Sequence, residues 1–220
     1  MRRGVTMFLD VHTHNPSTDP NILAIENRHS GFGEPVGSAY LSAGLHPWYI
    51  RPETLADDLD LLRRYAAQSQ IVAIGECGLD KLTATDWDTQ CRAFERQIAL
   101  AKELGKPLVI HCVKAFQECL HFLKDVRVPV IFHGINNRLS VIRPVIDAGY
   151  FLSFGKALLH PNEAILETFR AVSADRLFLE TDDTGCNIRE IYKTASRLRN
   201  IPEKEIALQL ETNFGKVFKQ

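Results

Sequence analysis

The sequence predicts an α/β fold, a (β/α)8 barrel, and three observations support this class. Short apolar runs of strand length alternate with segments of helical periodicity along the chain. The runs lack the polar alternation of a half-exposed strand, as expected for parallel strands that are buried on both faces. Several runs end in a residue that can bind a metal ion, such as His111 after Leu108-Val109-Ile110. Barrels of this class build their active sites at these strand ends.

The composition fits one globular domain that spans residues 1–220. The chain has 220 residues, of which 45% are hydrophobic, and its formal net charge is −1. This charge excludes an overall basic surface for nucleic acid, so any such contact has to come from a local patch. No linker, repeat or low-complexity segment interrupts the sequence, and we therefore expect a single domain.

The cysteines and the apolar segments indicate the compartment. The five cysteines are odd in number and form no Cys-x-x-Cys pair, which argues against a disulfide framework and favours a reducing environment. The basic start Met1-Arg2-Arg3 precedes an apolar run that ends at Asp10, which is too short for a signal peptide. No apolar stretch reaches the length of a transmembrane helix. We therefore expect a soluble cytoplasmic protein without membrane contact.

The N-terminal half is expected to begin with three strands that are joined without helices. Residues 15–20 are rich in Asn, Pro and Asp and leave no room for a helix, and residues 31–37 form a loop with Gly and Pro. The barrel is therefore expected to be trimmed in its first crossovers. Helical periodicity follows at 54–68 and at 86–104, where Gly105 is the stop signal. The expected strands of this half are 7–14, 22–26, 39–45 and 71–75.

The C-terminal half repeats a strand followed by a helix. Gly149 marks the end of one helix, and Pro202 suits the first turn of the last one. The expected strands are 108–111, 128–133, 150–154 and 176–181, and the expected helices are 115–123, 139–148, 163–172, 187–199 and 203–218. Both halves together give eight strands that mostly alternate with helices, which is the pattern of a (β/α)8 barrel.

Six residues of metal-binding type stand at or next to the ends of five expected strands. They are His12, His14, Glu76, His111, His133 and Asp182. The side chains of His12 and His14 project from the same face of a strand. This pair alone is equally compatible with a metal site and with a hydrogen-bonded pair in the core. Glu76 lies among glycines and apolar residues, where an unpaired carboxylate is costly to bury. A shared metal site gives all six residues a partner, and we therefore predict one.

The number and type of these ligands predict two divalent metal ions. Four imidazoles and two carboxylates exceed the needs of one tetrahedral ion, because a catalytic zinc site typically uses three protein ligands and a water. The set suits two ions bridged by a carboxylate and about 3.5–4 Å apart, which would activate a water and clamp a phosphoryl or carbonyl oxygen. Mixed nitrogen and oxygen ligands suit Zn, Mn or Fe more than Ca and are compatible with Mg.

Several segments carry a resemblance to a known family. The most specific is Gly75-Glu76-Cys77-Gly78-Leu79-Asp80, and the others are 9–14, 43–47, 94–101, 106–111, 179–182 and 212–218. In these residues and in their order along nearly the whole chain, the sequence resembles the TatD family of metal-dependent hydrolases, in the amidohydrolase-like barrel superfamily. The resemblance implies a metal-dependent hydrolase with a barrel fold.

The resemblance also implies roles for the predicted ligands. One ion would be held by His12, His14, Glu76 and Asp182, and the second by Glu76, His111 and His133, with Glu76 as the bridge. Asp182 would take the proton from the attacking water, so Asp182 and Glu76 are the expected catalytic carboxylates. Family members are described as divalent-metal-dependent deoxyribonucleases, and some cleave DNA from the 3′ end. The implied reaction is therefore phosphodiester hydrolysis of the DNase type.

The chain departs from the family pattern beside the ligands. The family usually has an Arg two positions after the histidine that corresponds to His111, whereas this chain has Val113, followed by Lys114. Residues 134–137 replace a Cys-Phe-Ser-Gly-like stretch, and residues 183–185 replace a Pro and a long loop. The predicted ligands are kept, whereas the loops that would face the substrate differ.

Three further residues are candidates near the site. His46, at the end of the third expected strand, either contacts a substrate phosphate or has a packing role. Lys114 is expected to bind substrate by supplying the charge of the missing Arg, with a solvated surface role as the alternative. Asp80 follows Glu76 by four residues and either orients a ligand histidine or caps a loop.

Three functions are open on the sequence alone. The first is a TatD-type phosphodiesterase that acts on DNA. The second is a hydrolase with the same metal site that acts on a small phosphoester, carboxylic ester or lactone. The changed loops and the near-neutral charge favour it somewhat more than they would for an ordinary member of the family. The third is a non-enzymatic metal-binding protein, against which the complete ligand set argues.

Overall fold

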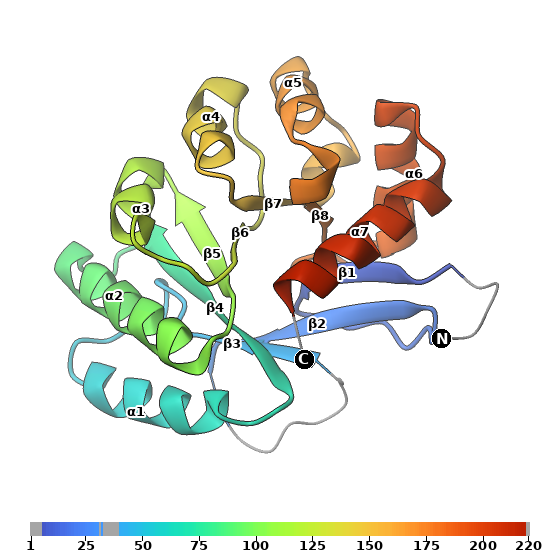
Figure 1. The fold of residues 1–220 in the computed structure, drawn as a ribbon. Coiled ribbons are helices and arrows are strands. Elements are labelled where there is room, and N and C mark those ends of the chain that lie inside the picture. Colours follow the sequence, from blue (N-terminus) through green and yellow to red (C-terminus); the bar gives the residue numbers. More distant parts are fainter. Residues whose placement is uncertain (1–5, 31, 33–39, 219–220) are drawn as a thin grey trace. The chain divides into compact units, whose positions relative to one another are not determined.

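The structure is a computed structural model that describes residues 6–30, 32 and 40–218 (Figure 1). The strands are β1 (Phe8–Thr13), β2 (Ile22–Arg28), β3 (Tyr40–Ala43), β4 (Ile71–Asp80), β5 (Leu108–Val113), β6 (Val130–Phe132), β7 (Phe151–Phe154) and β8 (Leu177–Leu179). The α-helices are α1 (Leu55–Ala66), α2 (Trp87–Leu104), α3 (Phe116–Leu123), α4 (Leu139–Asp147), α5 (Glu163–Ala171), α6 (Ile188–Arg199) and α7 (Glu203–Val217). Two short 3-10 turns, Lys156–Leu158 and Ala174–Arg176, flank α5.

The strands form the parallel sheet that the sequence predicts. They follow one another in sequence order, from β1 to β8. Strand pairing is parallel in β1–β2, β3–β4, β4–β5, β5–β6 and β7–β8. A parallel bridge between Thr13 and Asp182 joins the end of β1 to the segment after β8. The predicted (β/α)8 barrel class is therefore confirmed.

Two strands are longer than expected, and this changes the position of two predicted ligands. β4 continues to Asp80 and β5 to Val113, and their pairing runs from Ile74–Leu108 to Asp80–Val113 with a shift in register after Ile74. The sequence predicted that Glu76 and His111 stand at or directly after a strand end. That prediction is wrong, because both residues lie inside these paired strands.

The predicted trimming of the first crossover is confirmed. Residues 14–21 connect β1 to β2 and contain no helix, and all of them are described. Their turn is held by Asp19, whose Oδ1 accepts hydrogen bonds from the backbone and the side chain of Asn21. Most of the predicted loop 31–37 and the predicted start of the third strand at residue 39 lie outside the described residues.

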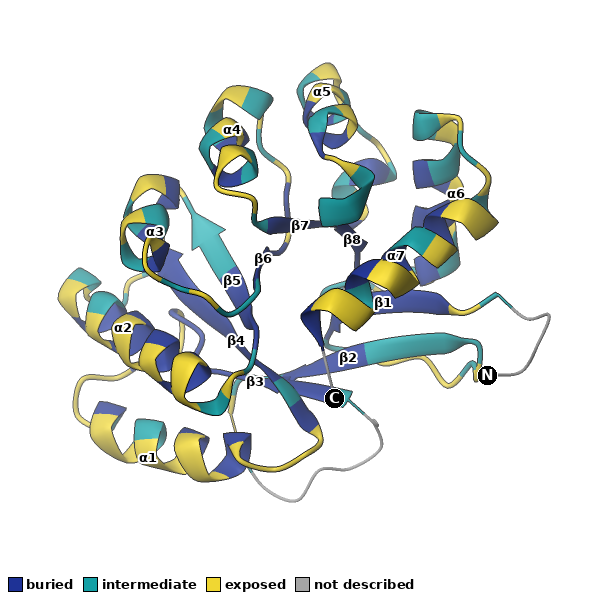
Figure 2. Ribbon diagram, in the orientation of Figure 1, coloured by how far each residue is buried: buried dark blue, intermediate teal, exposed yellow. Residues whose placement is uncertain are grey.

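Residues 27–132 form one of two compact units. In this unit α1 and α2 lie next to each other and both contact β4, and α3 contacts β4 and β5 (Figure 1). Each helix buries one face and exposes the other, as Figure 2 shows for α1 and α2. α2 begins after Asp86, whose side chain accepts a hydrogen bond from Thr89 N, and it ends at Gly105 in the left-handed conformation. Both ends agree with the prediction to within one residue.

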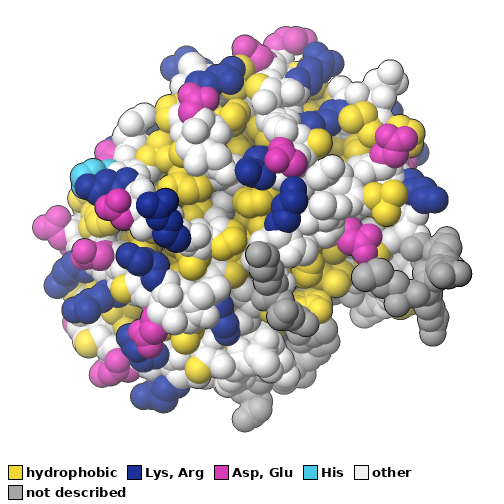
Figure 3. Space-filling model, viewed as in Figure 1, with side chains coloured by type: hydrophobic (Ala, Val, Ile, Leu, Met, Phe, Trp, Pro, Cys, Tyr) yellow, Lys and Arg dark blue, Asp and Glu magenta, His cyan; other side chains and the backbone are white. Residues whose placement is uncertain are grey.

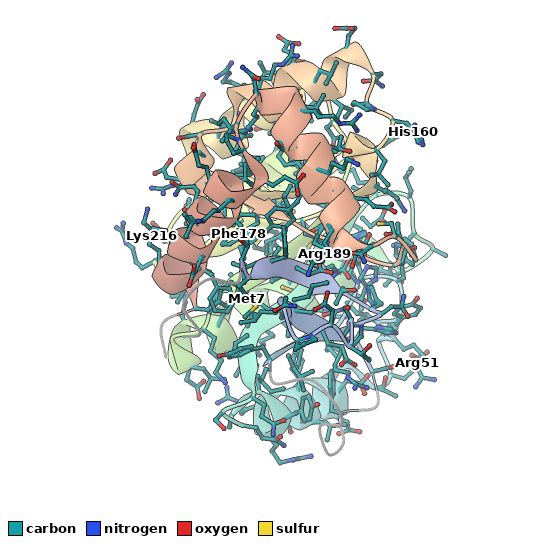
Figure 4. The ribbon with its side chains drawn as sticks, turned by 90° about the vertical axis from the view of Figure 1, so that its right-hand side faces the viewer. Met7, Arg51, His160, Phe178, Arg189 and Lys216 are labelled. Atoms are coloured by element: carbon teal, nitrogen blue, oxygen red, sulfur yellow. The ribbon has the colours of Figure 1, made fainter. Side chains whose placement is uncertain are left out.

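Residues 6–26 and 133–218 form the second unit, in which α6 and α7 contact β1 and β8. Tyr192 of α6 is fully buried, and its hydroxyl group accepts a hydrogen bond from Leu9 N and donates one to Leu9 O, both at 3.1 Å. Arg189, one turn earlier, places its guanidinium over the Phe8 ring and forms an ion pair with Asp19 (Figure 4). These contacts fix α6 against β1, the strand that carries His12.

Within residues 6–30, 32 and 40–218, no helix combines the length and the apolar character needed to cross a bilayer.

We predict that Tyr192→Phe lowers the free energy of unfolding by about 1–3 kcal/mol, because the buried polar groups of Leu9 lose the hydroxyl partner. The midpoint of urea denaturation measures this change. Tyr49→Phe is the matched control, since it removes a hydroxyl group from an exposed side chain. Equal midpoints for the two variants would contradict the prediction.

Candidate metal centre

The unit of residues 27–132 brings together His46, Glu76 and His111, here called the His46 group. His46 follows β3, Glu76 lies in β4 and His111 lies in β5. Glu76 Oε1 is 3.1 Å from His46 Nε2 and 2.8 Å from His111 Nδ1, and the two nitrogens are 3.2 Å apart. The side chains of His46 and Glu76 are buried, whereas His111 is slightly more exposed. Two imidazoles and one carboxylate therefore converge at one point with little access for water.

The backbone around Glu76 is held by residues of two neighbouring strands. Asn27 at the end of β2 accepts hydrogen bonds at its Oδ1 from Glu76 N at 2.8 Å and from the Ser42 hydroxyl group at 3.0 Å. Gly44 lies so close to β4 that a Cβ there would stand 2.7 Å from Glu76 O. A side chain at position 44 would therefore push β4 away and displace Glu76.

Helix α2 holds the segments on both sides of this group through two buried glutamines. Gln97 accepts a hydrogen bond from Leu45 N at 2.7 Å and donates one to Leu45 O at 3.1 Å, directly before His46. Gln90 makes the same pair of bonds with Asp80, at 2.9 and 3.1 Å. Each amide group satisfies both polar groups of a buried backbone unit, which would otherwise lack partners.

Asp80 contacts the imidazole of His111 on the side away from Glu76. Its Oδ2 is 3.0 Å from His111 Nε2 and 2.6 Å from Trp48 Nε1. Burial alone would raise the pKa of Asp80, but the hydrogen bonds from Trp48 and His111 hold it below its usual value. An ionised Asp80 can only accept, so the proton of a neutral His111 lies on Nε2 and the lone pair of Nδ1 faces Glu76. The structure agrees with both predicted roles for Asp80, because its Oδ1 also accepts a hydrogen bond from Leu82 N at 2.8 Å in the loop after β4.

The second unit brings together His12, His133 and Asp182, here called the His12 group. Asp182 Oδ1 is 3.6 Å from His12 Nε2 and also 3.6 Å from His14 Nε2. The rings of His12 and His133 lie with centroids 4.2 Å apart. His12 is fully buried, whereas about a quarter of the side chain is exposed in His14 (27%) and in Asp182 (25%). The group is therefore closed at His12 and open to solvent at Asp182.

The backbone of β1 holds Asp182 between the two histidines. Asp182 N donates to His12 O and His14 N donates to Asp182 O, both at 2.9 Å. Asp182 has a φ of 56°, which is uncommon for a residue with a side chain and which these two bonds stabilise. Two positions earlier in β1 than His12, Asp10 accepts hydrogen bonds from Thr181 N and the Thr181 hydroxyl group. Burial raises the pKa of Asp10 to about 7, against the opposing effect of these bonds.

Glu180 supports His133 from behind. Its side chain is fully buried, and its Oε1 accepts a hydrogen bond from Gly134 N at 2.6 Å and lies 3.6 Å from His133 Nδ1. Gly155 packs so closely that a Cβ there would stand 3.1 Å from Glu180 Cγ. Glu180 therefore fixes the turn that carries His133 and places a carboxyl group beside its imidazole.

The comparisons with known proteins identify the family of the chain. A family model described as TatD related DNase matches residues 2–219. The chain belongs to this family. An uncharacterized metal-dependent hydrolase of Buchnera aphidicola is 30% identical over 81% of this chain and 73% of that protein. A protein of Erwinia tasmaniensis described as the 3′-5′ ssDNA/RNA exonuclease TatD is 29% identical over 98% of this chain and 89% of that protein.

A solved structure of the family shows the same fold. The crystal structure of a TatD homologue from Escherichia coli matches with a TM-score of 0.80 at 21% identity and covers 98% of this chain and 99% of the homologue. The predicted resemblance to the TatD family is therefore confirmed, and the chain is a metal-dependent hydrolase of this family.

The donor atoms of both groups fit the metal on which TatD hydrolases depend. In each group, three ligand atoms lie within 4.8 Å of one another. In the His46 group they are 2.8 to 3.2 Å apart. Ligands of a tetrahedral ion with bonds of about 2.1 Å are separated by about 3.4 Å, so this group is close to a ready-made ligand set. Imidazole and carboxylate donors suit Zn and Mn and are compatible with Mg.

The six predicted ligands are thus distributed over two units. A seventh residue, His46, lies beside the two ligands of one unit. His12, His14, His133 and Asp182 lie in one unit, and Glu76 and His111 in the other. His46, predicted to contact substrate, lies within hydrogen-bond distance of Glu76 and His111. Lys114 is exposed directly after β5, with a φ of 53°. The predicted sharing of Glu76 between two ions involves both units and stays a prediction.

The sequence reasoning missed the residues that position the ligands. Asn27 falls one residue beyond the predicted end of its strand, and no feature of the sequence indicated its contact with Glu76. Asp10 and Glu180 did have one, because each is a carboxylate inside an apolar strand-like run that also carries a predicted ligand. Gln90 and Gln97 are seven residues apart, which places two amides on one face of the predicted helix.

We predict that Gln97→Met lowers the free energy of unfolding by about 2–4 kcal/mol, because the N–H and C=O of Leu45 both become buried without a partner. Urea denaturation followed by circular dichroism measures the change. Gln68→Met, at an exposed position, is the control and should leave the midpoint within error of the parent protein. A similar midpoint for Gln97→Met would mean that the Leu45 segment is held by other contacts.

Proposed function

We propose that this TatD-family hydrolase cleaves phosphodiester bonds of single-stranded nucleic acid with the help of two divalent metal ions. The observation that carries the proposal is the presence of two clusters of ligand-type residues, the His46 group and the His12 group. The name of the Erwinia relative, a 3′-5′ ssDNA/RNA exonuclease, supports a single-stranded substrate that is degraded from its 3′ end. The ions are Mg, Mn or Zn on the basis of the donor atoms.

The resemblance implies an assignment in which Glu76 belongs to both ions. We propose instead that each group would hold one ion through its own imidazole and carboxylate atoms. His46, Glu76 and His111 form the first ligand set, and His12, His133 and Asp182 the second, with His14 beside it. Asp80 contacts His111 Nε2 at 3.0 Å and would orient its imidazole, and Glu180 places a carboxyl group 3.6 Å from His133 Nδ1. When bound, the ions supply Lewis acidity that lowers the pKa of water and stabilises charge on the phosphoryl oxygens.

The proposed reaction assigns the proton of the attacking water to Asp182. Its carboxylate is partly exposed and lies 3.6 Å from two imidazoles, so water reaches it while neighbouring histidines hold its orientation. The water oxygen forms a bond to phosphorus, and one of the two ester P–O bonds of the phosphodiester breaks. The departing ester oxygen takes up the proton that Asp182 received and ends as a hydroxyl group.

The charge distribution supports a local contact with one strand rather than a broad contact with a duplex. The formal net charge is −1, and on the face shown in Figure 3 the basic and acidic side chains are interspersed. Duplex-binding proteins usually concentrate basic residues on one face. Lys114, exposed after β5, is proposed to contact a substrate phosphate, as the sequence predicted.

We predict that metal-stripped protein does not shorten a single-stranded oligonucleotide and that Mg²⁺, Mn²⁺ or Zn²⁺ restores stepwise shortening. Glu76→Gln, which removes the charge but keeps the shape, is expected to reduce the rate by at least about 100-fold. Denaturing gel electrophoresis of a 5′-labelled oligonucleotide measures both effects. A metal-loaded protein that leaves the oligonucleotide intact would overturn the nucleic-acid assignment and favour a small phosphoester or ester as the substrate.

We further predict that Asp80→Asn weakens divalent metal binding by about 10- to 100-fold, because His111 loses the carboxylate that fixes its tautomer. Competition with a chromogenic chelator measures the affinity without any substrate. Asp86→Asn is the matched control, since Asp86 is exposed and Asn also caps helices well. An unchanged affinity in Asp80→Asn would show that Asp80 does not act through His111.

A further inference from the structure

Two exposed aromatic side chains stand directly after His46. Trp48 is 54% exposed and Tyr49 is 56% exposed, and among the described large apolar residues with high exposure they are the two aromatic ones. Exposing most of two large rings is unfavourable in water, and a pair of them beside a candidate active site indicates a binding surface.

Trp48 is held in place although its ring is exposed. Its Nε1 donates to Asp80 at 2.6 Å, and its backbone N donates to His46 Nδ1 at 3.1 Å. The indole ring lies 4.9 Å from the His46 ring and 5.8 Å from the His111 ring, measured between centroids. The only polar group of the side chain is therefore satisfied within the protein, and an ordered apolar surface remains exposed next to the His46 group.

The Tyr49 ring is held by a contact with His29. Its ring stacks on the His29 ring with centroids 4.9 Å apart and an interplanar angle of 26°, and it lies 6.3 Å from the Trp48 ring. The exposed Arg51 follows two residues later (Figure 4). The segment thus combines two ordered aromatic rings with a nearby cation, which is the combination that single-stranded nucleic-acid sites use for bases and phosphates.

We propose that Trp48 forms a stacking platform for a nucleobase next to the scissile phosphodiester of a single strand, with the Tyr49 ring at 75° to it so that it meets the base at its edge. The proposal rests on the proposed function and adds the part of the substrate that is recognised. A base stacked on Trp48 lies beside Asp80, His111 and His46, so its own backbone is delivered to the His46 group. Stacking uses the face that every base has, so the site accepts all four bases and rejects a strand end that lacks a base.

The first experiment measures binding without cleavage. The chain has two tryptophans, so Trp87→Phe leaves Trp48 as the only indole fluorophore. Metal-loaded Trp87→Phe protein is titrated with oligonucleotides whose 3′-terminal linkages are phosphorothioates, which slow hydrolysis. An oligonucleotide with a base at its 3′ end is expected to quench Trp48, and one of equal length with abasic 3′-terminal positions is expected to quench it much less. Equal quenching by the two, or none by either, would overturn the stacking site.

The second experiment distinguishes the effect of the Trp48 ring on substrate binding from the effect of its hydrogen bond to Asp80. We compare KM for the oligonucleotide with a terminal base with KM for the abasic one, and expect the abasic KM to be roughly 5- to 100-fold higher in the parent protein. Trp48→Leu is expected to abolish this ratio, and Tyr49→Leu, which removes the ring at the edge of the base, to reduce it. Trp48→Phe also lacks the donor to Asp80 but keeps a ring, and it should retain most of the ratio, as should Tyr49→Phe.

The outcomes distinguish this proposal from the function on which it rests. Leu208→Ala removes an exposed apolar side chain on α7 and should leave the ratio unchanged. If the parent protein cleaves neither oligonucleotide, the proposed function fails. If it cleaves both with equal KM, or if Trp48→Phe loses the ratio as fully as Trp48→Leu, the function stands and the stacking site is wrong.

Discussion

The constraint on which this structure depends is the burial of carboxyl groups inside an apolar sheet. Asp10, Glu76, Asp80 and Glu180 are all nearly inaccessible to water. A carboxylate in such a place is costly unless polar groups surround it. The fold supplies these groups from backbone N–H donors, hydroxyl groups and imidazoles, as it does for Asp10 through Thr181. The same contacts that make burial tolerable also fix the directions of the candidate ligands, so stability and site geometry depend on one network.

Helix α2 fixes the position of the segment before His46, which has no regular secondary structure. Gln90 and Gln97 stand two turns apart, and each holds one backbone unit through both its N–H and its C=O. The distance between the two amides is set by the helix itself, because its rise per residue is fixed. The segment before His46 and the end of β4 are therefore spaced by α2 and not by their own loops. This explains how a site with buried ligands stays ordered although His46 lies outside any regular element.

Local signals in the sequence were sufficient for most of the fold. The ends of α2 follow from Asp86 and Gly105, because capping depends on residues at the helix ends themselves. The metal-binding residue types could be recognised for a similar reason, since buried carboxylates and histidines at strand ends are rare without a role. The extension of β4 to Asp80 could not be predicted, because Gly75 and Gly78, considered alone, indicate the end of a strand. In the structure they permit close approach of β5, and a Cβ at Gly78 would stand 2.0 Å from His111 O. The contact of Asn27 with Glu76 spans 49 positions of sequence, so no local pattern encodes it.

The His12 group shows why one of its members is suited to exchange a proton with water. His12 is inaccessible and His133 is nearly so, whereas Asp182 and His14 keep about a quarter of their side chains exposed. Asp182 also has a left-handed backbone conformation, with a φ of 56°. The two hydrogen bonds with His12 O and from His14 N hold that conformation without any contribution from the side chain. The carboxylate of Asp182 lies 3.6 Å from the imidazoles of His12 and His14, at the partly exposed edge of the group. The proposed role of Asp182 as proton acceptor rests on this partial exposure, because a carboxylate that exchanges a proton with water has to be reached by it.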